Sequence, residues 1–189
     1  MIDYFALLDE ARRPWLDPNE LKEKYFARAR IASADAGLNE AFRVLSDPKL
    51  RLQHLLTLEG AQMTAGRPVP PSVAELFWNT GTLLREIDRW LLQSAEASSA
   101  LSRALLSGEK ARLERKLEVF AEQLDAVYAD EIISLREIDN ADWRNDRPRL
   151  VELHDSISYL TRLRDQVKEK RLGMANAGMT NVEGMTRSE

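Results

Sequence analysis

The sequence contains no cysteine among its 189 residues, and this absence excludes several kinds of chemistry. Without a thiol, the chain cannot form a disulfide, a thiolate metal site, sulfur ligation of an iron–sulfur cluster or a thiol nucleophile. The sequence also lacks an apolar run of about twenty residues and a charged segment followed by an apolar one near its start. We therefore expect a cytoplasmic protein with no membrane span and no secretion signal.

An excess of positive charge is also missing. The formal net charge is −4, so the chain as a whole offers no basic field to a nucleic acid, and we expect no nucleic-acid partner. The composition is 44% hydrophobic and 31% charged, which is typical of a soluble chain that buries a core. A folded protein is therefore predicted.

Motifs that carry enzymatic or metal chemistry are absent as well. The sequence has no glycine-rich phosphate loop, no Gly-x-Ser-x-Gly turn and no zinc-ligand spacing. Its two histidines, His54 and His154, are far apart and belong to neither a Glu-x-x-His nor a His-x-x-x-His pattern. We therefore predict no enzyme activity, no metal site and no cofactor.

Strand signals are lacking too, because no alternating β-branched segment is bounded by turn residues. Helical spacing of apolar residues dominates, which predicts an all-α fold. Glycine and proline then divide the chain. They indicate a helical module at 1–66, a proline-rich linker at 67–71, a three-helix bundle at 72–172 and a mobile tail at 173–189.

The first module shows clear helix boundaries. Asp17-Pro18 with Glu20 has the form of an N-cap, a proline at N1 and a capping-box acid, and Asp47-Pro48 ends one helix and begins another. The apolar residues of the two central helices should bury one another as a hairpin. These residues are Leu21, Tyr25, Leu38, Phe42 and Leu45.

The body of the chain is predicted to hold three long antiparallel helices. The first should begin near Ser72, where Glu75 completes a capping box, and should continue to about Leu106. Gly108 is expected to break the chain before the second helix. Apolar residues in the second and third helices alternate steps of four and three, which is typical of helices packed side by side.

Two surface features stand out. The segment at 18–31 carries more cations than acids, and these cations could attract an acidic partner or simply solubilise an exposed helix face. The cations are Lys22, Lys24, Arg28 and Arg30. In addition, Phe77 and Trp78 are adjacent and cannot both face the same core, so one is available either to a partner or to the neighbouring module.

Several stretches occur in the order found in one family. DYFALL, DPNELKEKYFARAR and LNEAFRVLSDPKLRLQHLLTLEG in the first module, followed by LLREID and LHDSISYLTRLRDQVKEK in the body, resemble the HscB family of J-type co-chaperones of iron–sulfur cluster assembly. The resemblance covers about residues 1–172. It implies a J-domain helical hairpin and a C-terminal three-helix bundle in an L-shaped arrangement.

The sequence departs from that family at the tip of the hairpin. There J-domains carry a His-Pro-Asp tripeptide that triggers ATP hydrolysis in a DnaK-type or HscA-type chaperone, whereas this sequence has Ser33, Ala34 and Asp35. The resemblance therefore implies a degenerate J-domain without ordinary ATPase stimulation. Chaperone docking would fall to the four cations of the second helix together with Asp35.

The family's second partner is an IscU-type scaffold protein. The resemblance places its apolar contact pair at Phe77 and Trp78, and it matches Tyr159 to the family's phenylalanine near the last helix, with Ser158 where arginine is expected. We therefore expect a non-catalytic HscB-type protein that binds protein partners. The alternative is a helical structural or interaction module for an unrelated protein.

Overall fold

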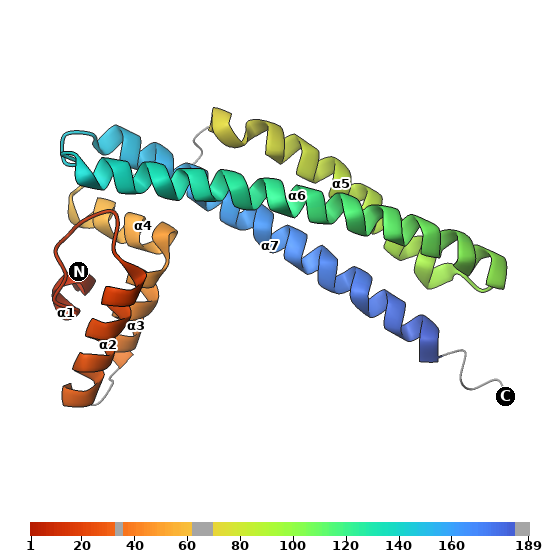
Figure 1. Ribbon diagram of the computed structural model, residues 1–189, viewed down its shortest axis with the longest axis horizontal. Coiled ribbons are helices and arrows are strands. Elements are labelled where there is room, and N and C mark those ends of the chain that lie inside the picture. Colours follow the sequence, from red (N-terminus) through yellow and green to blue (C-terminus); the bar gives the residue numbers. More distant parts are fainter. Residues whose placement is uncertain (33–35, 62–69, 184–189) are drawn as a thin grey trace. The chain divides into compact units, whose positions relative to one another are not determined.

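The computed structural model describes residues 1–32, 36–61 and 70–183, and these residues are folded into α-helices (Figure 1). No β-strand occurs within these ranges, so the prediction of an all-α fold is confirmed. The helices are α1 (Tyr4–Leu7), α2 (Pro18–Ala32), α3 (Ala36–Ser46), α4 (Pro48–Leu58), α5 (Pro71–Glu96), α6 (Ala100–Asn140) and α7 (Arg147–Glu183).

The helices form two compact units whose boundaries differ from the predicted domains. Unit 1 joins Met1–Pro70 to Tyr128–Ser158, and unit 2 joins Pro71–Val127 to Tyr159–Glu189. The end of α6 and the start of α7 therefore belong with the first module rather than with a separate bundle. Most of the predicted linker, residues 67–69, lies outside the described residues.

The core of unit 1 explains this division. Helix α3 contacts α1, α2 and α4, and the same continuous cluster includes apolar side chains from the far end of the chain. Burial of this many large apolar side chains is the main stabilising contribution to the unit. The cluster includes Phe5, Leu8, Leu21, Leu38, Leu45, Leu52, Leu55, Leu56, Leu135, Trp143, Leu150, Leu153 and Ile157.

Local sequence signals fix the helix starts in unit 1. Asp17 Oδ1 accepts hydrogen bonds from the backbone N–H groups of Asn19 (2.8 Å) and Glu20 (3.2 Å), and Asp47 Oδ1 accepts one from Leu50 (3.0 Å). Each acid is followed by a proline at the first helical position, whose missing N–H needs no partner there. Both predicted N-caps are thus present.

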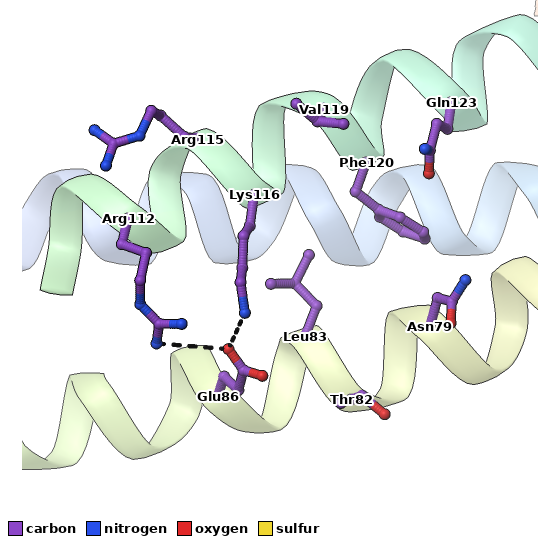
Figure 2. Close-up of a pocket in the computed structure, with 10 residues that line it drawn as sticks. All are labelled: Asn79, Thr82, Leu83, Glu86, Arg112, Arg115, Lys116, Val119, Phe120 and Gln123. Atoms are coloured by element: carbon purple, nitrogen blue, oxygen red, sulfur yellow. Dashed lines mark hydrogen bonds and ion pairs between the residues drawn. The ribbon is translucent and has the colours of Figure 1, made fainter.

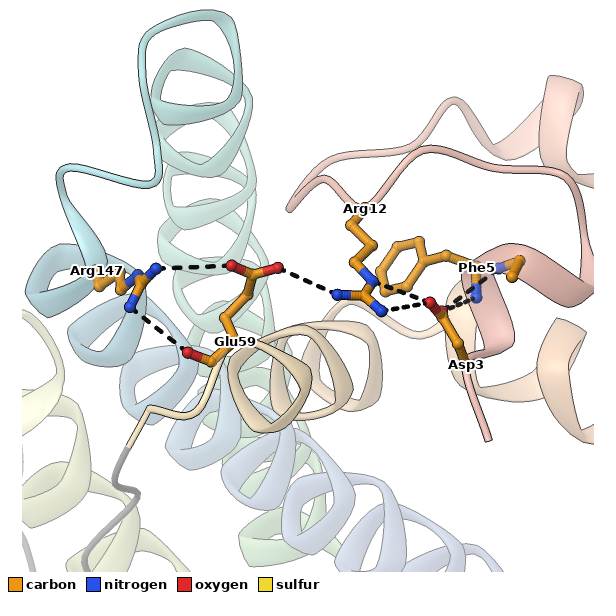
Figure 3. Close-up of polar contacts among 6 residues, drawn as sticks. Asp3, Phe5, Arg12, Glu59 and Arg147 are labelled. Atoms are coloured by element: carbon orange, nitrogen blue, oxygen red, sulfur yellow. Dashed lines mark hydrogen bonds and ion pairs between the residues drawn. The ribbon is translucent and has the colours of Figure 1, made fainter. Parts of the chain in front are cut away.

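A chain of charged side chains ties the first loop of unit 1 to α4 and α7 (Figure 3). Arg12 Nη2 lies 2.8 Å from Asp3 Oδ2, and Arg12 Nη1 lies 3.6 Å from Glu59 Oε1. Arg147 Nη2 approaches the other oxygen of Glu59 at 3.6 Å. Asp3 also caps α1 by accepting from the Phe5 N–H, so one network fixes several segments that are distant in sequence.

Arg51 is a buried cation that joins the loop before α2 to the end of α3. Its Nε donates to the Pro14 carbonyl at 2.8 Å and its Nη1 to the Leu45 carbonyl at 2.6 Å. Because these acceptors are neutral, burial lowers the pKa of Arg51 to about 10, an effect that the more distant Asp47 opposes. The guanidinium thereby satisfies a carbonyl at the end of α3 that the helix itself leaves open.

Unit 2 packs three helices around an apolar core. Its long helices follow the predicted order, but the break between the first two falls elsewhere than expected. Helix α5 ends at Glu96 and α6 begins at Ala100, so Gly108 lies inside α6 rather than ending a helix. Ser99 marks the new helix start, since its Oγ accepts from the Ser102 N–H at 3.0 Å.

The last helix is longer than predicted. The sequence indicated a helix end at Leu172 and a mobile tail from 173 to 189, whereas α7 continues to Glu183. The reason is packing. Met174 is buried, and a Cβ at Gly173 would lie 3.7 Å from Leu91 of α5, so neighbouring side chains cover this turn despite its weak helical pattern.

Candidate protein-binding surfaces

Helix α2 separates its four predicted binding cations onto two faces. Lys24 and Arg28 are one turn apart and face the loop after α1, where Lys24 Nζ lies 3.0 Å from Glu10 Oε1 and Arg28 Nη2 lies 3.8 Å from Asp9 Oδ2. Lys24 also donates to the Asp9 carbonyl at 3.1 Å. These two cations are therefore partly neutralised within unit 1.

Lys22 and Arg30 lie on the other face, and neither makes an ion pair with any residue that the structure describes. Both are exposed, and Phe26 stands one turn from each of them with 49% of its surface exposed. The four cations thus do not form one continuous stripe. The face available to a partner is Lys22, Phe26 and Arg30, which we call the α2 outer face.

Phe26 was not among the sequence-predicted site residues. Its neighbour Tyr25 shares the inward face with Leu21, and adjacent residues on a helix are about 100° apart, so Phe26 cannot face the same core. The adjacency of Tyr25 and Phe26 in the sequence therefore indicates that Phe26 faces outward. It is the same argument that singled out Phe77 and Trp78 in the body of the chain.

The predicted packing of the hairpin is observed. Leu21, Leu38 and Leu45 are buried, and the rings of Tyr25 and Phe42 stack with centroids 4.4 Å apart. The Tyr25 hydroxyl donates to Asn39 Oδ1 at 2.7 Å, which satisfies its polar end near the surface. Packing between α2 and α3 therefore holds the two helices of the hairpin together.

The tip itself comprises Ser33, Ala34 and Asp35, and all three lie outside the described residues. Helix α2 ends at Ala32 and α3 begins at Ala36. The predicted role of Asp35 in chaperone binding consequently remains a prediction from the sequence.

The aromatic pair on α5 is open to solvent. Phe77 is 43% exposed and Trp78 is 74% exposed, and their rings meet edge to face with centroids 6.0 Å apart. Of the four tryptophans, Trp90 and Trp143 are buried, so Trp78 differs from those core residues. Exposed tryptophan adjacent to a second aromatic ring is typical of a protein contact.

Tyr159 of α7 is half-buried, and the guanidinium of Arg162 lies over its ring, 5.8 Å from the ring centroid. Lys170 forms an ion pair with Asp88 across a separation of 82 residues, and Gly173 meets Leu91 at the same separation. Helices α5 and α7 are therefore neighbours that run in the same direction near Asp88 and Lys170. That Phe77, Trp78 and Tyr159 form one scaffold-binding surface stays a prediction from the sequence.

The histidines and acids form no metal centre in the part of the chain that the structure describes. His54 is buried, its Nε2 accepts from the Tyr4 N–H at 3.1 Å, and its ring packs against those of Tyr4 and Phe5. Burial lowers the pKa of His54, so the neutral ring acts as a core residue. Among the same described residues, no helix is both long enough and apolar enough to cross a membrane.

Comparison with known proteins gives a fold but no sequence match. No family model and no curated protein matches the sequence. The solved structure of chaperone HscB from Vibrio cholerae is similar, with a TM-score of 0.55 at 16% identity over 89% of this chain and 96% of that one. Human co-chaperone protein HscB also aligns, at 18% identity over 90% of this chain and 83% of its own, with a TM-score of 0.45. The similarity to the Vibrio cholerae structure shows that the chain has an HscB-like fold.

Proposed function

We propose that this protein is a non-catalytic, J-domain-like co-chaperone of the HscB type that binds protein partners without stimulating ATP hydrolysis. The observation that carries the proposal is the HscB-like fold, which extends over 89% of the chain while the hairpin tip lacks His-Pro-Asp. Cytoplasmic chaperone regulation or iron–sulfur cluster assembly is the setting that this combination favours.

The absence of stimulation follows from the residues at the tip. Ser33 and Ala34 supply neither the ring nitrogens of histidine nor the fixed φ of proline. The polar and conformational features that an intact J-domain offers its chaperone are therefore not reproduced. The protein is expected to leave the ATPase rate of a DnaK-type or HscA-type chaperone at its basal value.

Docking to such a chaperone is assigned to the α2 outer face. Lys22 and Arg30 are exposed beside Phe26, whereas Lys24 and Arg28 face acids of their own unit. Lys24 and Arg28 already have carboxylate partners within unit 1. An acidic surface of the chaperone would therefore interact more strongly with Lys22 and Arg30.

Calorimetry with the chaperone from the same organism, at low and moderate salt, tests this assignment. Reversing Lys22 and Arg30 to glutamate should abolish salt-sensitive binding, while the matched reversal of Lys24 and Arg28 should weaken it less. Equal effects of the two double reversals would reject the outer face. Full ATPase stimulation by the wild-type protein would reject the non-stimulating role.

An IscU-type scaffold is the proposed second partner, and Phe77, Trp78 and Tyr159 form its proposed contact. Exposure of the aromatic pair supports this surface. Pull-down with a variant carrying Phe77→Ala and Trp78→Ala should lose the scaffold. The matched control replaces Leu92 and Leu172 with alanine, because both are similarly exposed in the same unit but stand apart from the pair.

One observation favours the alternative, an interaction module for an unrelated protein. Asp9 and Glu10 compensate two of the four cations, which reduces the field that would draw α2 to an acidic chaperone surface. If the wild-type protein binds neither the chaperone at low salt nor the scaffold, this alternative replaces the first proposal.

A further inference from the structure

Within unit 2, helix α6 carries one buried apolar seam and a second, exposed series of residues that combines apolar and basic side chains. The inward seam, with steps of four, three and four residues, is buried in the core and consists of Leu113, Leu117, Phe120 and Leu124. A second series has the same alternation of four and three. It consists of Leu101, Leu105, Gly108, Arg112, Arg115 and Val119, and we call it the outer seam.

The outer seam is open to solvent. Leu101 is 72% exposed, Leu105 is 69% exposed and Val119 is 54% exposed, and the glycine and both arginines are exposed as well. Spacing of this kind keeps one stripe of a helix facing a neighbouring helix over several turns. Three large apolar side chains exposed along one stripe of a helix form a surface that a second helix can cover.

Gly108 at the centre of the seam has no role in packing within unit 2. A Cβ added there would meet nothing within 4 Å, although glycine in a helix interior costs about 1 kcal/mol relative to alanine. A small residue between exposed leucines allows the backbone of another helix to approach closely. Gly108 therefore lowers the stability of α6 by itself, and the closer contact that it allows with a partner helix would offset this loss.

The charges beside the seam define what the partner must carry. Arg112, Arg115 and Lys116 line a groove of about 590 Å³ between α5 and α6, and Glu86 is the carboxylate that lines it with them (Figure 2). Lys116 Nζ lies 2.8 Å from Glu86, and Arg112 Nη2 lies 3.8 Å from Glu86 and 3.3 Å from Glu109 of its own helix. The hydrogen bond from Lys116 lowers the pKa of Glu86, which stays ionised. Glu86 and Glu109 thus face three cations, which leaves one positive charge in excess.

Arg115 extends away from Glu86 in Figure 2 and makes no ion pair with any described residue. The net charge of the whole chain is −4, so this local excess of cations runs against the general balance. The groove also has apolar lining residues, because Leu83 of α5 lies beside the end of Lys116 and Phe120 of α6 lies farther along the groove (Figure 2). Cations beside apolar side chains suit an amphipathic segment with carboxylates.

We propose that the outer seam of α6 binds an acidic amphipathic helix of a partner protein, which places apolar side chains against Leu101, Leu105 and Val119 and carboxylates opposite Arg112 and Arg115. Apolar flanks would supply the buried area, and the central charges would fix the register and select the partner. The seam shares no residue with the α2 outer face or with the surface formed by Phe77, Trp78 and Tyr159. This inference therefore stands apart from the proposed function.

Two designed helical peptides test the proposal on the full chain. Each has about three heptads with leucine at the seam positions, and the two central seam positions are glutamate in one peptide and lysine in the other. Fluorescence anisotropy of the labelled peptides, at low and moderate salt, reports their binding. The acidic peptide is expected to bind about tenfold more tightly than the lysine peptide, with a difference that shrinks as salt rises.

The matched variants are Arg115→Glu in the seam and Arg103→Glu, which lies on the same helix but on the opposite face and is also exposed. Arg115→Glu should weaken the acidic peptide about fivefold or more and strengthen the lysine peptide, whereas Arg103→Glu should change neither by more than about twofold. Circular dichroism of each variant verifies that α6 remains folded.

Three outcomes would overturn the proposal: no binding of the acidic peptide at low salt, equal binding of the two peptides, or equal effects of the two arginine variants. Chaperone and scaffold binding by Arg115→Glu should match the wild type. This comparison distinguishes a loss of peptide binding at the outer seam from a loss of the proposed chaperone and scaffold binding.

Discussion

Arg13 and Asp139 form a two-pronged ion pair inside unit 1, across 126 residues of sequence. Arg13 Nε lies 3.1 Å from Asp139 Oδ1 and 2.9 Å from Oδ2, and Nη2 contacts Oδ2 as well. Only 1% of the Asp139 side chain is exposed, and its Oδ1 also accepts from the Trp15 N–H at 3.4 Å. The pair fastens the loop before α2 to the end of α6.

Arg13→Ala should therefore be strongly destabilising. It leaves a buried carboxylate with the Trp15 N–H as its remaining described partner, so we expect a loss of about 3 kcal/mol in the free energy of unfolding. Urea denaturation measures this loss. Arg28→Ala is the matched control, because its pair with exposed Asp9 is long and should contribute less than about 0.5 kcal/mol. Equal losses in the two variants would contradict the assigned role of Asp139.

Truncating the hairpin core should reveal what holds the J-like module together. Leu45 is fully buried, so Leu45→Ala should reduce the free energy of unfolding by about 3 kcal/mol through lost burial and the cavity left behind. Phe26→Ala, on the exposed face of α2, should cost less than about 1 kcal/mol. Thermal unfolding of both variants compares them, and a larger effect at Phe26 would show that α2 packs differently.

The stability of unit 1 should fall on mild acidification because of His54. Burial lowers the pKa of His54 in the folded state below its ordinary value near 6.5, so the unfolded chain takes up the proton first. The contribution of the neutral ring is fully present above about pH 6.5 and is lost as the pH falls through the folded-state pKa. Nearby Asp3 moderates the loss by favouring the charged ring, and Arg12 opposes that effect.

Urea denaturation of the wild type and of His54→Gln between about pH 7.5 and 5 measures this dependence. The wild type should lose more stability than the variant over that interval. Parallel pH profiles for the two proteins would show that His54 does not titrate as described.

Two glycines should respond oppositely to alanine. Gly108 lies inside α6 with open space where a Cβ would project, so Gly108→Ala should stabilise the isolated protein by about 1 kcal/mol. Gly60 has a φ of +71°, a conformation that strains other residues, so Gly60→Ala should destabilise it by about 1 kcal/mol. Thermal unfolding of both variants measures these stability changes. Changes of the same sign in the two variants would contradict the roles assigned to Gly108 and Gly60.

The sequence by itself determined the fold class, the order of the helices and the starts of α2 and α4. These features depend on local physics, because Asp17 and Asp47 cap the chain within three residues and apolar spacing defines each buried face. It also determined that the hairpin tip lacks histidine and proline. The sequence does not predict the boundary between α5 and α6 correctly. Gly108 indicates a helix break, whereas α6 continues through it.

Only the tertiary structure decided which segments share a core and which surfaces stay open. The end of α6 belongs to unit 1 because Leu135 packs into its core and Asp139 pairs with Arg13, and no local pattern encodes contacts across more than a hundred residues. The same reason applies to α2. Its four cations look equivalent in the sequence, and folding places Asp9 and Glu10 beside two of them while leaving Lys22 and Arg30 exposed.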